Sequence, residues 1–242
     1  MSQAPQPRLR PGAAHRRARQ LLASGRRVVL GLAGPPGVGK STFADGLVEA
    51  LRADGDEVAL VPMDGFHIAH AALTERGLET VKGAPGTFDV AGYVALLGRL
   101  RDSPEETVWA PRFDRGLEDA IAASNPVEPS VRLVVTEGNY LLLQQGAWSR
   151  VRPLLDECWY LHVDDAVRQS RLVSRHRHHG RSEAEARRWA LGNDESNAGI
   201  VVGTRGAADA VVDLGGAAPT HAAPTDVAAG ERESRCRPAG DG

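Results

Sequence analysis

The stretch GPPGVGKS, residues 34–41, decides the fold that we expect for this chain. It satisfies the pattern G-x-x-x-x-G-K-[ST], which wraps a phosphate group when a strand precedes it and a helix follows it. A strand-like apolar run, residues 28–33, comes directly before it, and apolar residues recur at helical spacing from Phe43 to Leu51. The alternative is a plain glycine-rich turn between strand and helix. The complete pattern in this context predicts a phosphate-binding loop.

Each part of this motif has a chemical use. Its glycines allow tight turns that bring backbone amides onto phosphate oxygens, and the helix N-terminus adds partial positive charge. Lys40 places a compact ammonium group between the outer phosphates, and Ser41 offers a hydroxyl to Mg²⁺. Lysine occurs only at positions 40 and 82 among the 29 basic residues, so both lysines are functional candidates. The predicted nucleotide-binding residues of this segment are Gly34, Pro35, Pro36, Gly37, Val38, Gly39, Lys40, Ser41 and Thr42.

Length and composition limit the class of protein. The 242 residues predict one large domain with room for a lid or tails. A net charge of −2, with 42% hydrophobic and 25% charged residues, argues against a disordered chain and against a nucleic-acid partner. We find neither an apolar run of the roughly 20 residues that a membrane helix needs nor a secretory signal, and expect a cytoplasmic protein without membrane contact. Two cysteines cannot form a disulfide framework or a four-ligand zinc site.

Strand-like apolar runs alternate with helical patterns along the chain, which predicts an α/β fold. The runs are residues 28–33, 58–63, 131–136, 158–163 and 210–214. We expect a P-loop NTPase with three layers, α/β/α, in which helices cover a five-stranded parallel sheet. Residues 1–13 and 215–242 are rich in proline or in small residues and are expected to be disordered, which leaves residues 14–214 as the folded domain.

Two carboxylates follow predicted strands. Asp64 comes at the end of the second run and Glu137 at the end of the third. Because ligands bind at the carboxyl edge of parallel sheets, both are candidates for the reaction centre. Asp64 could accept a proton from an attacking hydroxyl or help to hold the metal, and Glu137 is the candidate Mg²⁺ ligand, directly or through water. For Asp64 the alternative is an aspartate that only shapes the turn before Gly65.

An arginine-rich segment, residues 168–185, follows the fourth run and is predicted to form a helical lid. Arg168, Arg171 and Arg175 share one face of a helix, and such groups could stabilise a phosphoryl group in transfer. We predict Arg171 and Arg175 as nucleotide-binding residues, and Arg175 as catalytic beside Asp64 and Lys40. The alternative is a solvated basic face. Ser182 and Glu185 form a capping-box pattern that predicts the start of another helix.

The segments GPPGVGKS, MDGFH, LTERGLETVKGAPGTFD, PRFDR, VVTEGNYLL and RLVSRHRHHGR occur in an order that resembles one known family. It is the phosphoribulokinase, uridine kinase and pantothenate kinase family of P-loop small-molecule kinases, over about residues 26–214. The resemblance implies ATP as phosphoryl donor and a five-stranded parallel sheet. It also implies that Asp64 is the catalytic base, that Ser41 and Glu137 help to bind Mg²⁺, and that the arginine segment is the lid.

The phosphoryl acceptor is expected to carry a hydroxyl group, and the resemblance leaves a nucleoside, a sugar or a pantothenate-like compound open. Gly83 stands where uridine kinases carry a ribose-binding aspartate, and the similar bacterial kinases linked to fructose transport or to nucleotides match TFDVAGYVALL and EGNYLLL better. A salt bridge for Asp114 and packing for Tyr140 are the alternatives to substrate contact. The oligomeric state stays open, a homodimer included. The candidate acceptor contacts are His67, Lys82, Arg112, Asp114, Tyr140 and Arg181.

A second hypothesis keeps the nucleotide site but assigns the chain to switches or assembly factors that hydrolyse GTP or ATP. The guanine-reading pattern Asn-Lys-x-Asp is absent from the sequence, because neither Lys40 nor Lys82 follows an asparagine. The main prediction is therefore a phosphotransferase with an alcohol group as acceptor.

Overall fold

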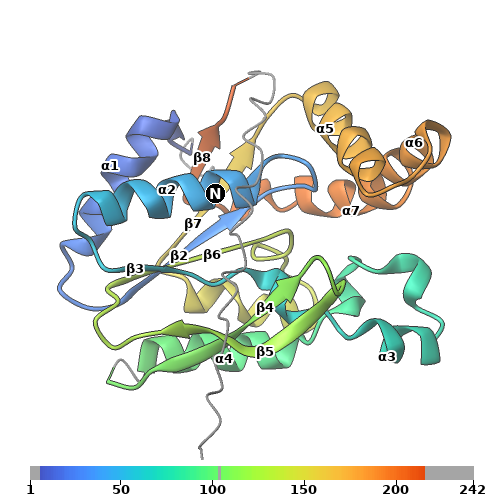
Figure 1. Cartoon of the computed structure of the whole chain (residues 1–242). Helices are drawn as coiled ribbons and strands as arrows, with labels where there is room; N and C mark the ends of the chain where they lie inside the picture. The colour runs from blue at the N-terminus through green and yellow to red at the C-terminus, as the bar shows by residue number, and fades with distance from the viewer. Residues whose placement is uncertain (1–5, 103–104, 216–242) are drawn as a thin grey trace, which may run out of the picture.

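The computed structural model describes residues 6–102 and 105–215 (Figure 1). Six parallel strands form the central sheet, in the order β1-β8-β7-β2-β6-β3. The five predicted runs supply five of these strands, and the prediction of a parallel α/β sheet is confirmed. The strands are β1 (Arg8–Leu9), β2 (Val28–Ala33), β3 (Val58–Leu60), β6 (Leu133–Gly138), β7 (Glu157–His162) and β8 (Ala210–Asp213).

The sheet has one strand more than predicted, and this strand lies inside residues 1–13, which we expected to be disordered. Its residues Arg8 and Leu9 pair with Val211 and Val212 of β8, and α1 (Pro11–Leu22) follows with proline in its first turn. The prediction was wrong for residues 6–13 because two paired residues are too few to produce an alternating pattern. The predicted C-terminal tail lies outside the described residues beyond position 215.

Helices cover both faces of the sheet and give the three predicted layers. On one face, α1 and α2 (Lys40–Ala53) pack small and aliphatic side chains against β2, among them Ala18 and Leu47. On the other face, α4 (Val90–Asp102) packs Tyr93 and Leu97 against the strands. Figure 1 shows α2 and α4 on opposite sides of the sheet. The short 3-10 turns η4 (Gly146–Arg150) and η5 (Arg152–Leu154) complete the layer of α4.

A group of three helices stands at one end of the molecule (Figure 1). It consists of α5 (Asp165–His178), α6 (Glu183–Leu191) and α7 (Asn193–Val202). The predicted capping box is confirmed, because the Ser182 side chain accepts from the Glu185 amide and the Glu185 carboxylate accepts from the Ser182 amide. The predicted lid segment therefore spans most of α5 and the start of α6.

Two strands outside the main sheet, β4 (Val108–Asp114) and β5 (Asp119–Val127), form an antiparallel hairpin that the sequence did not predict. Most of β5 is exposed, so it carries no apolar run. Short segments fill the remaining connections: η1 (Met63–Phe66), α3 (His70–Glu75), η2 (Glu79–Val81), η3 (Pro85–Thr87) and η6 (Arg205–Ala207). Within the described ranges, no helix has both the length and the apolar character that crossing a membrane requires.

Candidate active site

The phosphate-binding loop connects the end of β2 to the start of α2. Two of its glycines, Gly37 and Gly39, have φ angles of 79° and 101°, in the left-handed region that favours glycine. A Cβ atom on Gly37 would lie 2.6 Å from the Leu172 side chain and 2.7 Å from the Arg168 carbonyl oxygen of α5. Glycine is therefore required at position 37 both for the turn and for the close approach of α5.

Lys40 stands at the first position of α2 and turns its ammonium group back over the loop. Its Nζ donates to the carbonyl oxygens of Gly34 and Pro35, at 2.9 and 3.2 Å, and to Asn139 Oδ1 at 2.6 Å. Enclosure by the protein lowers the pKa of Lys40, and the charges of Glu137 and Asp64 act in the opposite direction. Lys40 thus contacts the loop directly, and its charge interacts with those of both predicted carboxylates.

Glu137 lies at the end of β6, next to α2. The Ser41 hydroxyl donates to Glu137 Oε1 at 2.9 Å, and Glu137 is only 4% exposed. Burial and then the charge of Asp64 raise the pKa of Glu137 to about 7, although Lys40 and the Ser41 hydrogen bond lower it. Ser41 and Glu137 are thus in contact, and the charges of Lys40 and Asp64 are close enough to influence Glu137.

Asp64 belongs to the η1 turn that follows β3. Its backbone carbonyl, rather than its carboxylate, makes the contacts of the turn, since it accepts from the His67 amide at 3.2 Å and lies 2.9 Å from His67 Nδ1. The His67 ring packs against Phe88 and Phe113, with centroid distances of 4.1 and 5.0 Å. Burial lowers the pKa of His67 and so favours the neutral ring, while the charge of Asp64 acts in the opposite direction. His67 therefore lies beside Asp64, where an acceptor contact was predicted.

Three other residues that were predicted as acceptor contacts form hydrogen bonds with backbone groups of the protein. Lys82 Nζ donates to the Glu118 carbonyl oxygen at 2.6 Å and lies over the Phe113 ring. Tyr140 is fully buried, and its hydroxyl donates to the Gly83 carbonyl oxygen at 2.6 Å. The Asp114 carboxylate accepts from the backbone amides at positions 116 and 117 and closes the β4–β5 turn. These groups hold the loop after α3 and the hairpin in place.

The predicted lid arginines separate into different environments. Arg168 is buried, with 1% of its side chain exposed, and pairs with Asp165 at 3.0 Å and Glu195 at 2.6 Å. It also donates to the Pro36 carbonyl oxygen at 3.4 Å, and Arg171 donates to the Val38 carbonyl oxygen at 3.0 Å. A solvated face was the wrong interpretation of Arg168. Both side chains hold α5 against the outside of the phosphate loop.

Arg175, one helical turn further along α5, remains 44% exposed and lies 4.0 Å from Asp194 of α7. Its charge is close enough to lower the pKa of Lys40. Arg181 stacks on the Trp189 ring at 4.1 Å and lies 3.2 Å from His176 Nδ1. Of the two, Arg175 is the arginine whose charge reaches the phosphate loop. Arg112, predicted as an acceptor contact, is exposed on β4, and Thr42 is exposed in the first turn of α2.

Asn139 is a candidate site residue that the sequence interpretation missed. It accepts the shortest hydrogen bond of Lys40 and also hydrogen-bonds to the Tyr140 side chain. The available signal was its place in the sequence, two residues after Glu137 at the end of a predicted strand. It could not be recognised because an asparagine after a strand is also common in turns.

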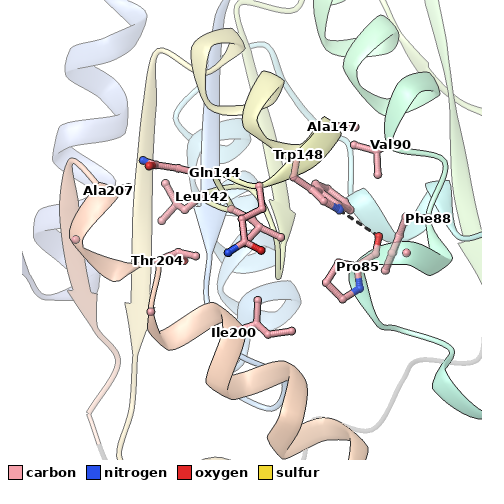
Figure 2. A pocket seen from close by; sticks show the side chains of 16 residues that line it. Pro85, Phe88, Val90, Leu142, Gln144, Ala147, Trp148, Ile200, Thr204 and Ala207 are labelled. Carbon is pink, nitrogen blue, oxygen red and sulfur yellow. Dashed lines mark hydrogen bonds between the residues drawn. The ribbon is translucent and has the colours of Figure 1, made fainter.

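A groove of about 870 Å³ lies on the α4 side of the sheet, between the segment before α4, the segment after β6 and the end of α7 (Figure 2). Trp148 and Phe88 form part of its wall, and Trp148 Nε1 donates to the Pro85 carbonyl oxygen at 3.1 Å. Residues 34–41 and the two carboxylates are not among its lining residues. The groove is thus a feature separate from the phosphate loop.

Comparisons with known proteins find similar sequences and structures. A family model described as methylmalonyl Co-A mutase-associated GTPase MeaB matches residues 4–70, the part of the chain that holds the phosphate loop and Asp64. A "putative uridine kinase" of Schizosaccharomyces pombe is 36% identical over 168 residues, which cover 67% of this chain and 72% of that protein. An "ATP-dependent kinase-like protein" of Aspergillus versicolor is 34% identical over 152 residues, 59% of this chain and 88% of that protein.

Among solved structures, a "putative fructose transport system kinase" from Silicibacter sp. TM1040 is similar, with a TM-score of 0.77 and 37% sequence identity. The similarity covers 84% of this chain and 98% of that chain. It extends far beyond the phosphate loop and includes most of the described fold. This chain therefore belongs to the P-loop kinase family of the uridine and pantothenate kinases, a family of ATP-dependent small-molecule kinases.

Proposed function

We propose that this protein transfers the γ-phosphoryl group of ATP to a hydroxyl group of a small metabolite, with Mg²⁺ as the assisting ion. The observation that carries the proposal is the hydrogen bond between Ser41 and Glu137 at the edge where β2, β6 and β3 end, with the charges of Lys40 and Asp64 acting on Glu137. Phosphoryl transfer depends mainly on positioning and on charge stabilisation, and these groups supply both.

The triphosphate would lie against residues 34–42. Backbone amides of the loop and of the first turn of α2 would bind phosphate oxygens, and Lys40 would exchange its carbonyl and Asn139 contacts for the outer phosphates. Arg168 and Arg171 support this by fixing the loop from outside. These contacts within the protein would hold the loop in its shape, which lowers the entropic cost of nucleotide binding.

The donor set beside the loop fits Mg²⁺. Ser41, Glu137 and Asp64 offer a hydroxyl and two carboxylates, and hard oxygen donors are the ligands that Mg²⁺ prefers. Among the described residues, no group of three or more His, Cys, Asp or Glu side chains could hold a metal alone, and Mg²⁺ in kinases usually takes its remaining ligands from nucleotide phosphates and water. When bound, the ion would neutralise charge on the transferring phosphoryl group. Glu137 and Ser41 would hold it.

Asp64 is the proposed catalytic base. Its carboxylate is not needed for the η1 turn, because the backbone carbonyl makes the turn contacts. It can therefore accept the proton of the attacking hydroxyl or orient that hydroxyl toward the γ-phosphorus. Arg175 would add a positive charge over the phosphates from α5.

The acceptor is proposed to bind between Asp64, the β4–β5 hairpin and the loop after α3. His67 and the exposed Arg112 are the predicted contacts best placed for it, and Arg181 would join only if the helical group closes. Lys82, Tyr140 and Asp114 shape the site through the contacts described above. A nucleoside, a sugar and a pantothenate-like compound are the three acceptor classes that we propose to test.

The decisive experiment measures ATP consumption by the purified protein with Mg²⁺, with and without nucleosides, sugars and pantothenate, and identifies products by mass spectrometry. A phosphorylated product formed with one acceptor supports the kinase. Hydrolysis that no acceptor stimulates would support the alternative switch function, which the MeaB match over residues 4–70 brings into consideration. A protein that binds ATP without consuming it under any condition would contradict both.

A further inference from the structure

Strand β3, which is followed by Asp64, stops pairing with β6 just before the candidate active site. The last backbone bond between β3 and β6 runs from the Val61 amide to the Val135 carbonyl oxygen, at 2.8 Å. Pro62, the next residue, has no backbone N–H to continue the ladder. The η1 turn with Asp64 follows at once, so backbone pairing does not extend from β6 to Asp64.

Where the backbone pairing between β3 and β6 ends, a side-chain hydrogen bond continues the connection. Thr136 of β6 is fully buried, and its hydroxyl donates to the Val61 carbonyl oxygen at 2.6 Å. The Tyr93 hydroxyl of α4 lies 2.6 Å from the same threonine oxygen. Because the single proton of Thr136 points to Val61, Tyr93 must be the donor in this second bond. The result is a series of two hydrogen bonds that runs from Tyr93 through Thr136 to Val61, just after β3.

This series of hydrogen bonds involves residues close in sequence to both carboxylates. Thr136 is the residue next to Glu137, and the alternation of β6 sends Thr136 toward α4 and Glu137 toward α2. On the other side, Val61 precedes Asp64 by three residues, and the Tyr93 ring packs against Phe66, two residues after Asp64, at a centroid distance of 5.0 Å. Thr136 therefore contacts Val61, just before the η1 turn, and Tyr93 contacts Phe66 at the end of that turn, so the two contacts lie on either side of Asp64 in the sequence.

We propose that Thr136, held by Tyr93, is a positioning residue that fixes Asp64 relative to Glu137 for phosphoryl transfer. The inference rests on the function proposed above. Thr136 is fully buried, and it would act by tying the segment after β3 to the strand that carries Glu137. A buried hydroxyl that served only the core would be replaceable by a methyl group with a loss of stability alone.

The test compares Thr136→Val, Thr136→Ser and Tyr93→Phe with the unmodified protein. A misplacement of catalytic groups by about 1 Å can cost on the order of 10²-fold in rate. We expect Thr136→Val to lower kcat by about 10-fold or more, with little change in the KM for ATP, and Thr136→Ser to restore kcat. Tyr93→Phe should fall between them. Thr204→Val is the matched control, because its hydroxyl also bonds a carbonyl oxygen, that of Val201, away from the carboxylates.

A second readout does not need the acceptor. Hydrogen exchange of the backbone amides in residues 61–67, measured without nucleotide, should become faster in Thr136→Val and Tyr93→Phe but not in Thr136→Ser, and exchange in residues 28–33 should stay unchanged. If no acceptor activates the unmodified protein, the proposed function fails, whereas the exchange data still decide the positioning claim.

Unchanged exchange in residues 61–67, or an unchanged kcat with only a lower melting temperature, would overturn the proposal. If Thr136→Val does not fold, Tyr93→Phe decides by the same two measurements.

Discussion

Replacing Glu137 by glutamine should stabilise the nucleotide-free protein at pH 8 while abolishing Mg²⁺-dependent turnover. Glu137 is 4% exposed, and burial, followed by the charge of Asp64, raises its pKa from the ordinary 4.5 to about 7. Between these two pH values the unfolded chain has lost a proton that the folded protein keeps. The free energy of unfolding therefore falls as the pH rises from about 4.5 to about 7, and it stays low above that range.

The size of the effect follows from the same pKa values. Each pKa unit corresponds to 1.36 kcal/mol, so a rise from 4.5 to about 7 amounts to about 3 kcal/mol at pH 8. This sets an upper limit for the gain from Glu137→Gln, because the buried amide keeps only part of the hydrogen bonding with Ser41. At pH 4.5 most of the penalty is absent, and the variant should show no advantage there.

The assay is urea unfolding followed by circular dichroism at pH 5 and pH 8, without nucleotide and with a chelator present. The matched control is Glu49→Gln, which makes the same change at an exposed position of α2. Mg²⁺ and ATP should then stabilise the unmodified protein more than the Glu137→Gln variant. If the unmodified protein and the variant lose stability in parallel between pH 5 and pH 8, the reasoning about Glu137 is refuted.

Three further substitutions, one of them with a control substitution, test the other assigned roles. Asp64→Asn should lower kcat by about 10²–10⁴-fold, the usual contribution of a general base, with ATP binding retained in calorimetry; a near-normal kcat would remove the assignment. Gly37→Ala should lower the melting temperature and weaken ADP binding, because its Cβ would lie 2.6 Å from Leu172 Cγ at a φ of 79°. Gly46→Ala, in open space on α2, should instead stabilise by about 0.5–1 kcal/mol, and equal effects of the two in a thermal melt would contradict the loop geometry. Arg175→Ala should reduce kcat more than ATP affinity in steady-state kinetics; a loss in KM alone would assign it to ground-state binding.

The parts of the fold that could be predicted are those with a local signal. The phosphate loop, the strand before it and the helix after it form one continuous segment, and their residue types reflect their burial. The position of Asp64 and Glu137 at the same edge was also predictable, because parallel strands end at the same edge of a sheet. It required only that β6 lie between β2 and β3, as the structure shows.

The parts that could not be predicted depend on contacts between distant segments. Strand β1 exists because β8, about 200 residues later, offers it an edge. Arg168 has the spacing of an exposed arginine on a helix, but Glu195 and the Pro36 carbonyl, which come from two other segments, satisfy it in the interior. No periodicity within α5 carries that information, since it depends on how α7 packs beside the loop.

The same distinction, between features with a local sequence signal and features that depend on distant contacts, applies to the proposed catalytic centre and the proposed acceptor site. Lys40, Ser41 and Glu137 lie on regular elements of the sheet core, so their arrangement follows from the fold itself. The proposed acceptor side consists of the loop after α3 and the hairpin, which are joined by the hydrogen bond from Lys82 to the Glu118 carbonyl oxygen. Because this hydrogen bond uses a backbone acceptor, neighbouring side chains can change without breaking the contact between the loop and the hairpin. On the function proposed above, side chains of this wall would therefore select the acceptor, while the phosphate loop stays the same.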